Sequence, residues 1–193
     1  MNRSTQNTIG GWRLSRTSAW LPLFLTAITT ANSAKSQLVS PLLPTLAPVG
    51  AVSRYTDKLD IFTTDAAGVI RTAAWEPDFT DGWHGWWPIG DVRVPAGSRV
   101  GAVSRSTDKL DVFVTDGNGV IQTAAWEPDF TDWWHGWWEL NGGRAAPGAP
   151  VTAVSRSRDK LDAFAVGNDG RVWTAAWEPT FTDWWHGWWP IGE

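Results

Sequence analysis

One stretch of fifteen residues decides the fold: AAWEPDFTDWWHGWW, residues 124–138. Near copies stand 51 positions before and after it, as AAWEPDFTDGWHGWW at residues 73–87 and AAWEPTFTDWWHGWW at residues 175–189. The same register extends outward without a gap from residue 49 to the end of the chain. A period near 50 residues is typical of propeller blades and similar β units. The sequence therefore predicts three tandem β units.

Each unit contains four short segments with the pattern of strands, described here for the first copy. The segment 58–64 alternates apolar and polar residues with a period of two, and a turn with Gly68 joins it to the next segment. Pro77 ends that next segment because proline lacks the donor that a β ladder needs. The four predicted strands are residues 49–54, 58–64, 69–75 and 83–89. We expect an all-β fold of three four-stranded antiparallel blades, over residues 49–99, 100–150 and 151–193.

Three blades are fewer than a closed propeller needs. Propellers typically close with about four to eight blades, and an open arc leaves apolar sheet faces uncovered. Two interpretations follow. Two copies of the chain combine as a homo-oligomer that completes a six-bladed propeller, or the three blades are a truncated remnant of a longer array.

The composition excludes several classes of protein. Seventeen of the 193 residues are tryptophan, and only Trp12 and Trp20 lie outside the repeat. The absence of cysteine excludes disulfide frameworks and zinc ribbons. A net charge of −4 argues against nucleic-acid binding, which needs a basic surface. No cofactor is expected.

Residues 1–34 differ from the repeat. Basic residues (Arg3, Arg13 and Arg16) precede an apolar stretch at 20–31, and small residues follow it. This is the order of a secretory signal peptide, and the apolar stretch is too short for a membrane-spanning helix of about 20 residues. We expect a cleaved leader and a secreted, extracellular protein without a membrane span, with residues 35–48 as a linker. A mis-assigned start or a disordered extension is the alternative.

The repeated tryptophans have two interpretations. Large aromatic side chains fill the space between packed blades, each burying about 150–250 Å². Alternatively, an indole face presents a π surface to the C–H face of a sugar ring, while neighbouring charged groups bond the hydroxyls. Arg54 is equally a salt-bridge partner of Asp57 or Asp60. His84 is equally a backbone hydrogen-bonding group in a tight turn, and Asp57 a cap of its own turn.

Metal binding and catalysis are disfavoured. The three equivalent histidines have no ligand spacing that converges within a blade, so no metal is expected. An enzyme needs one asymmetric constellation, such as two carboxylates of different pKa, whereas every candidate group here occurs three times. Repeated equivalent sites suit a multivalent binder. The hypotheses are therefore a lectin, a structural or protein-interaction propeller, and, least favoured, a glycosidase.

The repeated strings, AVSRSxDKLDxF followed by TAAW and WxGWW, resemble the blades of the PLL-type lectins named from Photorhabdus. The resemblance covers residues 49–193 and implies a seven-bladed propeller whose pockets between blades bind fucose and O-methylated sugars. This sequence departs from that pattern in having three blades. The six-bladed fungal-type fucose lectins, in which Arg, Glu and Trp hold the sugar, are the second family considered.

Carried onto this chain, the resemblance implies one set of sugar-binding residues per blade. The candidates are Ser53, Arg54, Trp75, Glu76, Trp83, His84 and Trp87; Ser104, Arg105, Trp126, Glu127, Trp134, His135 and Trp138; and Ser155, Arg156, Trp177, Glu178, Trp185, His186 and Trp189. If the sites lie between adjacent blades, three blades complete only two pockets, and a further pocket needs a partner chain.

Overall fold

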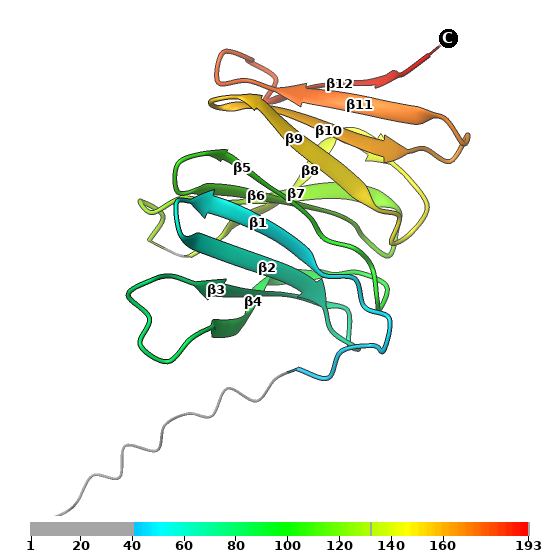
Figure 1. Cartoon of the computed structure of the whole chain (residues 1–193). Coiled ribbons are helices and arrows are strands. Elements are labelled where there is room, and N and C mark those ends of the chain that lie inside the picture. The colour runs from blue at the N-terminus through cyan, green and yellow to red at the C-terminus, as the bar shows by residue number, and fades with distance from the viewer. Residues whose placement is uncertain (1–40, 132, 193) are drawn as a thin grey trace, which may run out of the picture. The chain divides into compact units, whose positions relative to one another are not determined.

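The computed structural model describes residues 41–131 and 133–192, which form three four-stranded antiparallel sheets and no helix (Figure 1). The first blade contains β1 (Gly50–Tyr55), β2 (Lys58–Thr64), β3 (Val69–Trp75) and β4 (His84–Arg93). The second contains β5 (Gly101–Ser106), β6 (Lys109–Thr115), β7 (Val120–Trp126) and β8 (His135–Arg144). The third contains β9 (Val151–Ser157), β10 (Lys160–Val166), β11 (Val172–Trp177) and β12 (Trp185–Pro190).

The sequence-based prediction of an all-β fold with four strands per repeat is confirmed. Strands β2 and β3 have the predicted bounds, whereas β4 runs on to Arg93 instead of ending at Ile89. The register between β3 and β4 shifts at Thr72/Ala73, opposite Gly85, where the prediction placed a break in the strand. The predicted leader at residues 1–34 lies outside the described residues, as does the start of the predicted linker. None of the described segments is a helix able to cross a bilayer.

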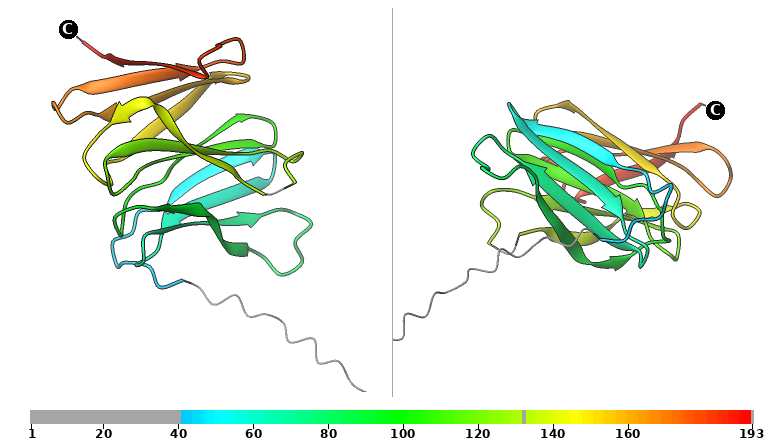
Figure 2. Two further views of the ribbon diagram at one scale, coloured as in Figure 1. Left: turned by 180° about the vertical axis from the view of Figure 1, so that it is seen from behind. Right: turned by 60° about the horizontal axis from the view of Figure 1, so that its bottom comes forward.

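The sheets stack in chain order with their first strands side by side, β1 next to β5 and β5 next to β9 (Figures 1 and 2). Each sheet is a meander, β1-β2-β3-β4 in the first blade, so that its strands lie in chain order from the first to the last. This is the arrangement of successive blades in a β-propeller. The three blades form a partial propeller.

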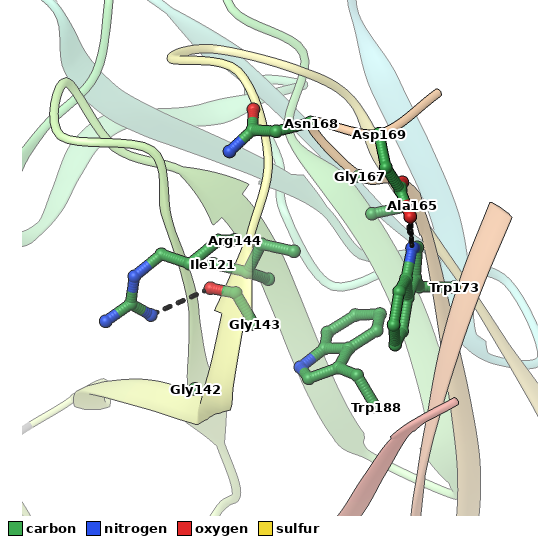
Figure 3. A pocket seen from close by; sticks show the side chains of 10 residues that line it. All are labelled: Ile121, Gly142, Gly143, Arg144, Ala165, Gly167, Asn168, Asp169, Trp173 and Trp188. Atoms are coloured by element: carbon green, nitrogen blue, oxygen red, sulfur yellow. Dashed lines mark hydrogen bonds between the residues drawn. The ribbon is translucent and has the colours of Figure 1, made fainter. Parts of the chain in front are cut away.

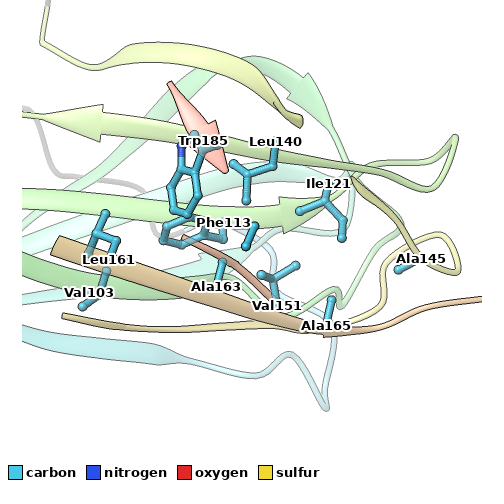
Figure 4. Close-up of a cluster of buried hydrophobic side chains, with 11 residues drawn as sticks. Val103, Phe113, Ile121, Leu140, Ala145, Val151, Leu161, Ala163, Ala165 and Trp185 are labelled. Atoms are coloured by element: carbon cyan, nitrogen blue, oxygen red, sulfur yellow. The ribbon is translucent and has the colours of Figure 1, made fainter. Parts of the chain in front are cut away.

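Two apolar cores lie between the blades, one at each junction. Phe62 of the first blade packs edge-on against Trp134, with ring centroids 6.0 Å apart, and Phe113 packs in the same way against Trp185 at 5.8 Å. Strand β6 alternates between the two cores, because Val112 belongs to the first core and Phe113 to the second (Figure 4). The middle blade is therefore buried on both faces, which explains its unbroken run of buried residues in β6.

The first strands of adjacent blades approach so closely that a glycine is required. A Cβ atom on Gly50 would lie 2.6 Å from the Val100 carbonyl oxygen, and one on Gly101 would lie still closer to the Val151 carbonyl oxygen. Thr152 occupies the equivalent position of the third blade, and its side chain is exposed. Neither Gly50 nor Gly101 has a positive φ, so the limit is the space between the blades.

Replacing Gly101 by alanine should therefore separate the second and third blades. We expect G101A to lower the free energy of unfolding by about 1–3 kcal/mol, because the new methyl group meets backbone that cannot move aside cheaply. The matched control T152A should change it by less than about 0.5 kcal/mol. Urea unfolding measures both. Equal effects of the two variants would contradict this account of the junction.

Candidate functional site

Two pockets lie between adjacent blades, at the end of the sheets where β3, β7 and β11 finish. We call them the first and second interblade pockets, with volumes of about 220 and 450 Å³. The first is lined by Arg54, Asp60, Thr72, Ala74, Glu76, Phe79 and Trp87, and by Leu110, Trp126, Trp133 and Trp134 of the next blade. The second is lined by Arg105, Lys109, Asp111, Thr123, Ala125, Glu127, Phe130, His135 and Trp138, and by Asp159, Leu161, Trp177, Pro179, Trp184 and Trp185.

A buried arginine lies at the base of the first interblade pocket. Arg54 Nη1 donates to Asp60 Oδ2 at 2.6 Å, and Nη2 donates to Glu76 Oε1. From the next blade, Asp108 Oδ1 lies 3.5 Å from Arg54 Nε. Of the two partners considered from the sequence, Asp60 is thus bonded to Arg54, while the counterpart of Asp57 comes from the neighbouring blade. The arginine therefore links three strands and two blades.

The second interblade pocket repeats this arrangement of one arginine and three carboxylates. Arg105 donates to Asp111 and to Glu127, and the carboxylate of Asp159 approaches from the third blade. In both pockets the arginine Nε is buried and makes no hydrogen bond to the described residues, but it faces the aspartate of the next blade as an ion pair. The Thr123 hydroxyl in the second pocket is also buried and has no hydrogen-bond partner among the described residues. An unsatisfied buried donor costs roughly 1–3 kcal/mol, and the aspartate of the next blade offsets part of that cost at each Nε.

Burial governs the carboxylates beneath the arginines. Desolvation raises the pKa of Asp111 to about 6, because it outweighs the attraction of Arg105. The same cause raises the pKa of Asp60 in the first pocket. At neutral pH the Asp111 carboxylate is ionised and holds Arg105 in place.

The third blade carries the same polar set without a neighbour over it. Arg156 donates to Asp162 and, at 3.1 Å, to Glu178. Its side chain is 46% exposed, whereas those of Arg54 and Arg105 are 4% and 5% exposed. Arg156 and Glu178 therefore form one half of a site.

An indole covers each buried arginine from the following blade. The Arg54 guanidinium lies 5.4 Å from the ring centroid of Trp126, and that of Arg105 lies 5.7 Å from Trp177. These distances fall in the cation–π range of about 6 Å. The counterpart Trp75 lies on the first-blade face that no described blade covers, so it lines neither pocket.

Two tryptophans that the sequence analysis did not select stand at the mouths of the pockets. Trp133 and Trp184 are 46% and 57% exposed, and they adopt positive φ angles of 79° and 71°. A bulky residue in this region is strained, and such strain concentrates at functional sites. The first blade has Gly82 at the equivalent position. The signal in the sequence is that this position varies within a string that otherwise differs only at Asp78, Asp129 and Thr180.

Of the remaining candidate tryptophans, some line the interblade pockets and some also pack against the apolar cores. Trp87 lies 5.3 Å from Trp133, and Trp138 lies 6.2 Å from Trp184, so each contributes a wall from the leading blade. Trp134 and Trp185 line the pockets and also pack on the core phenylalanines. At the outer faces, Trp83, the counterpart of Trp134 and Trp185, and Trp189, the counterpart of Trp87 and Trp138, are exposed.

The predicted serines lie outside both pockets and link the blades. Ser104 Oγ lies 2.9 Å from the carbonyl oxygen of Ser106 and 3.4 Å from that of Arg54 in the preceding blade. Ser155 Oγ lies 2.8 Å from the carbonyl oxygen of Ser157 and 3.2 Å from that of Arg105, so each hydroxyl shares its one proton between its own blade and the preceding one. Ser53, which has no described blade before it, bonds only the carbonyl oxygen of Tyr55. The serine thus holds the preceding arginine's backbone.

The histidines occupy the rim. His84 stacks on Phe79 with ring centroids 3.9 Å apart, and its Nε2 lies 2.7 Å from Asp81 Oδ1. His135 stacks on Phe130 in the same way and lines the second interblade pocket. His186 lies 3.0 Å from Asp183 on the outer face of the third blade. Across the described residues, no three acidic, His or Cys side chains are grouped as metal ligands.

A third hollow of about 300 Å³ lies between the second and third blades, at the other end of the sheets from the interblade pockets (Figure 3). We call it the Trp173 hollow. It is lined by Ile121, Gly142, Gly143, Arg144, Ala165, Gly167, Asn168, Asp169, Trp173 and Trp188. It is separate from the interblade pockets, because none of these residues lines either of them.

No protein-family model and no curated protein matches this sequence. Solved structures do. The BP39L lectin from Burkholderia pseudomallei is 25% identical, with a TM-score of 0.67 over 80% of this chain and 44% of that one. The Aleuria aurantia lectin, described as a six-bladed β-propeller with fucose recognition, is 17% identical, with a TM-score of 0.57 over 76% and 45%. SapL1 lectin, solved with alpha methyl fucoside, is 22% identical, with a TM-score of 0.54 over 76% and 46%.

The chain spans less than half the length of each of these lectins. Their likeness shows that the fold is that of a lectin-type β-propeller, of which the described residues build three blades. None of the three is named as PLL-type, so that narrower resemblance stays a prediction.

The buried arginine should be essential to the second junction. We expect R105A to lower the free energy of unfolding by about 3–5 kcal/mol, because it leaves two carboxylates buried without their cation. R156A, which removes the exposed counterpart, should cost much less. Urea unfolding at pH 7 compares them, and equal losses would contradict the role assigned to burial.

Asp111 should make stability depend on pH. Its folded pKa of about 6 lies above the ordinary 3.8, so the folded chain binds this proton at a higher pH than the unfolded chain does. The contribution of Asp111 to the free energy of unfolding therefore rises as the pH falls through this window. Between pH 7 and pH 5 the wild type should gain about 1 kcal/mol relative to D111N. Identical pH dependence of the two proteins in urea unfolding would overturn this.

Proposed function

We propose that this protein is a multivalent, carbohydrate-binding lectin whose sites lie between adjacent blades, with fucose or an O-methylated sugar as the ligand. The observation that carries the proposal is the interblade pocket, built twice, in which a buried arginine bonded to two carboxylates lies beneath an indole face of the next blade. The solved lectins support the choice of ligand, since two of them are described with fucose or alpha methyl fucoside.

The chemistry of the two interblade pockets suits a sugar. A pyranose has one apolar face of C–H groups and a rim of hydroxyls that need both donors and acceptors. Trp126 and Trp177 offer the flat apolar surface, the arginines offer donors, and Glu76 and Glu127 offer carboxylate acceptors. Bonds to charged partners are roughly twice as strong as neutral ones.

The repetition of the site supports binding rather than catalysis. Asp111 and Glu127 both bond the same arginine, so neither is left as an independent acid or nucleophile, and the first pocket repeats the arrangement. Single-sugar sites are weak, with a Kd of 1 mM corresponding to about 4 kcal/mol. Linked sites raise avidity by roughly 10²–10⁴. We therefore propose a non-enzymatic protein.

We further propose that a second copy completes the propeller. The outer face of the third blade presents Arg156, Glu178 and Trp189, and the outer face of the first blade presents Trp75 and Trp83, which are the two halves of the site found at each internal junction. Two copies would give the six blades described for the Aleuria aurantia lectin. The junction between chains would be wider at the inner strands, because Thr152 stands where both internal junctions need glycine.

The test of the sugar sites uses isothermal titration calorimetry with methyl α-L-fucoside. The double variant W133G/W184G places the first blade's glycine at both pocket mouths, and the backbone tolerates it because both φ angles are positive. We expect its affinity to fall about tenfold, the upper end of one aromatic contact. The control W173Q changes an indole at the opposite edge of the third blade to the residue found in the second blade, and it should bind as the wild type does.

Three results would contradict the proposal. If the folded wild type bound neither the fucoside nor any sugar of a glycan array, a protein-interaction propeller would be favoured. If the protein hydrolysed a chromogenic fucoside, a glycosidase would be favoured. Equally tight binding by W133G/W184G and the wild type would also contradict it.

The assembly is tested separately. Light scattering should give the mass of two chains, and calorimetry should give three sugar sites per chain. The mass of a single chain, with two sites per chain, would contradict closure of the propeller by a second copy.

A further inference from the structure

Four of the residues that line the Trp173 hollow differ from those at the equivalent positions of the first junction, although the blades are repeats. The equivalent positions there carry Val92, Val114, Asp116 and Gln122. At the second junction these become Gly143, Ala165, Gly167 and Trp173. Three side chains have been reduced or removed and one has become an indole. The hollow is therefore produced by changes confined to the second and third blades.

The first junction shows what fills this space elsewhere. Asp116 accepts a bond from Gln122 Nε2 at 2.7 Å, so carboxylate and amide occupy the turn together. Val92 packs against the first core. In the third blade Gly167 replaces the aspartate, and Trp173 Nε1 instead bonds Asp169 at 3.1 Å. The indole is thus fixed in orientation at the edge of an unfilled space.

A larger residue in place of either glycine would collide with the indoles that form the walls of the hollow. A Cβ on Gly167 would lie 2.9 Å from Trp173 Nε1, and one on Gly143 would meet the indole of Trp188. Both indoles therefore pack directly on backbone. Figure 3 shows them on one side of the hollow and the Arg144 guanidinium on the other.

The chemistry of the walls selects the ligand. Two indoles, Ile121 and Ala165 supply apolar surface. Most polar side chains of the walls already have partners: Trp188 Nε1 donates to the Leu140 carbonyl oxygen at 2.7 Å, Arg144 Nη1 donates to Glu139 at 2.7 Å, and Asp169 accepts from Trp173 Nε1. The Asn168 amide also lines the hollow and is exposed. A ligand rich in hydroxyls would give up more bonds to water than these walls replace.

We infer that the Trp173 hollow is a second kind of binding site, which takes a flat, uncharged aromatic ring with at most one or two polar substituents. The ring packs against the two indoles in the offset or edge-on geometries that aromatic pairs prefer. One substituent meets the Asn168 amide. The volume of about 300 Å³ is at the lower end of small-molecule sites, which suits one or two fused rings.

Indole itself is the probe, observed by saturation-transfer NMR and titrated by calorimetry against the full chain. Two variants restore the second blade's residues in the third: W173Q removes one aromatic wall, and A165V fills the floor. Each should weaken indole binding at least tenfold. W133G/W184G, which alters only the mouths of the interblade pockets, should bind indole as the wild type does, and methyl α-L-fucoside should not displace it.

Every outcome of these binding experiments either supports or overturns the inference. Absence of saturable indole binding to the wild type, unchanged binding by A165V, loss of binding in W133G/W184G, or displacement by the fucoside would each overturn the inference. If W173Q lowers the melting temperature strongly, A165V decides alone, because valine is the buried residue at the same position of the second blade. The inference does not rest on the lectin proposal, since its site, probe and variants are different.

Discussion

The ion pairs of Arg54 and Arg105 are the interaction on which the junctions and the pockets both depend. Each guanidinium is buried, bonds two carboxylates of its own blade, and lies under an indole and beside a carboxylate of the next blade. Buried charges are stable only when they are paired. The blades must therefore stack in one register, and that register brings the pocket walls together. The same guanidinium lines its interblade pocket, so the group that fixes the junction also lies at the candidate binding site.

The repeat and its exceptions have separate consequences. Where equivalent positions carry the same residues, two neighbouring blades form the same pocket at each junction, which favours binding of ligands that display the same sugar several times. Where equivalent positions differ, the feature occurs at one blade or one junction. Gly82 leaves the first blade without a mouth indole, Thr152 widens the face that a partner would meet, and Trp173 belongs to a hollow of another character. The third blade is thus the most specialised of the three.

The strands could be predicted from the sequence because each depends on local pattern: an alternation of period two, a glycine turn and a proline stop. The lining of the pockets could be predicted only in part. Arg54, Glu76 and Trp126, predicted because the same charged and aromatic types recur with the repeat, line the first interblade pocket. The predicted serines line neither pocket, because spacing does not say which face of β1 a side chain takes, and their hydroxyls bond backbone carbonyl oxygens. Trp133, which lines the first pocket, was not selected because its positive φ is displayed by no sequence pattern. The Trp173 hollow arises from four replacements that meet only when two blades pack.

A crystal structure of the protein with methyl α-L-fucoside tests the central claim most directly. The account predicts one fucoside in each interblade pocket, with ring hydroxyls bonded to the Arg54–Glu76 or Arg105–Glu127 pair and the sugar's apolar face on the indole of Trp126 or Trp177. Empty interblade pockets at saturating fucoside, or a fucoside bound only elsewhere, would contradict it.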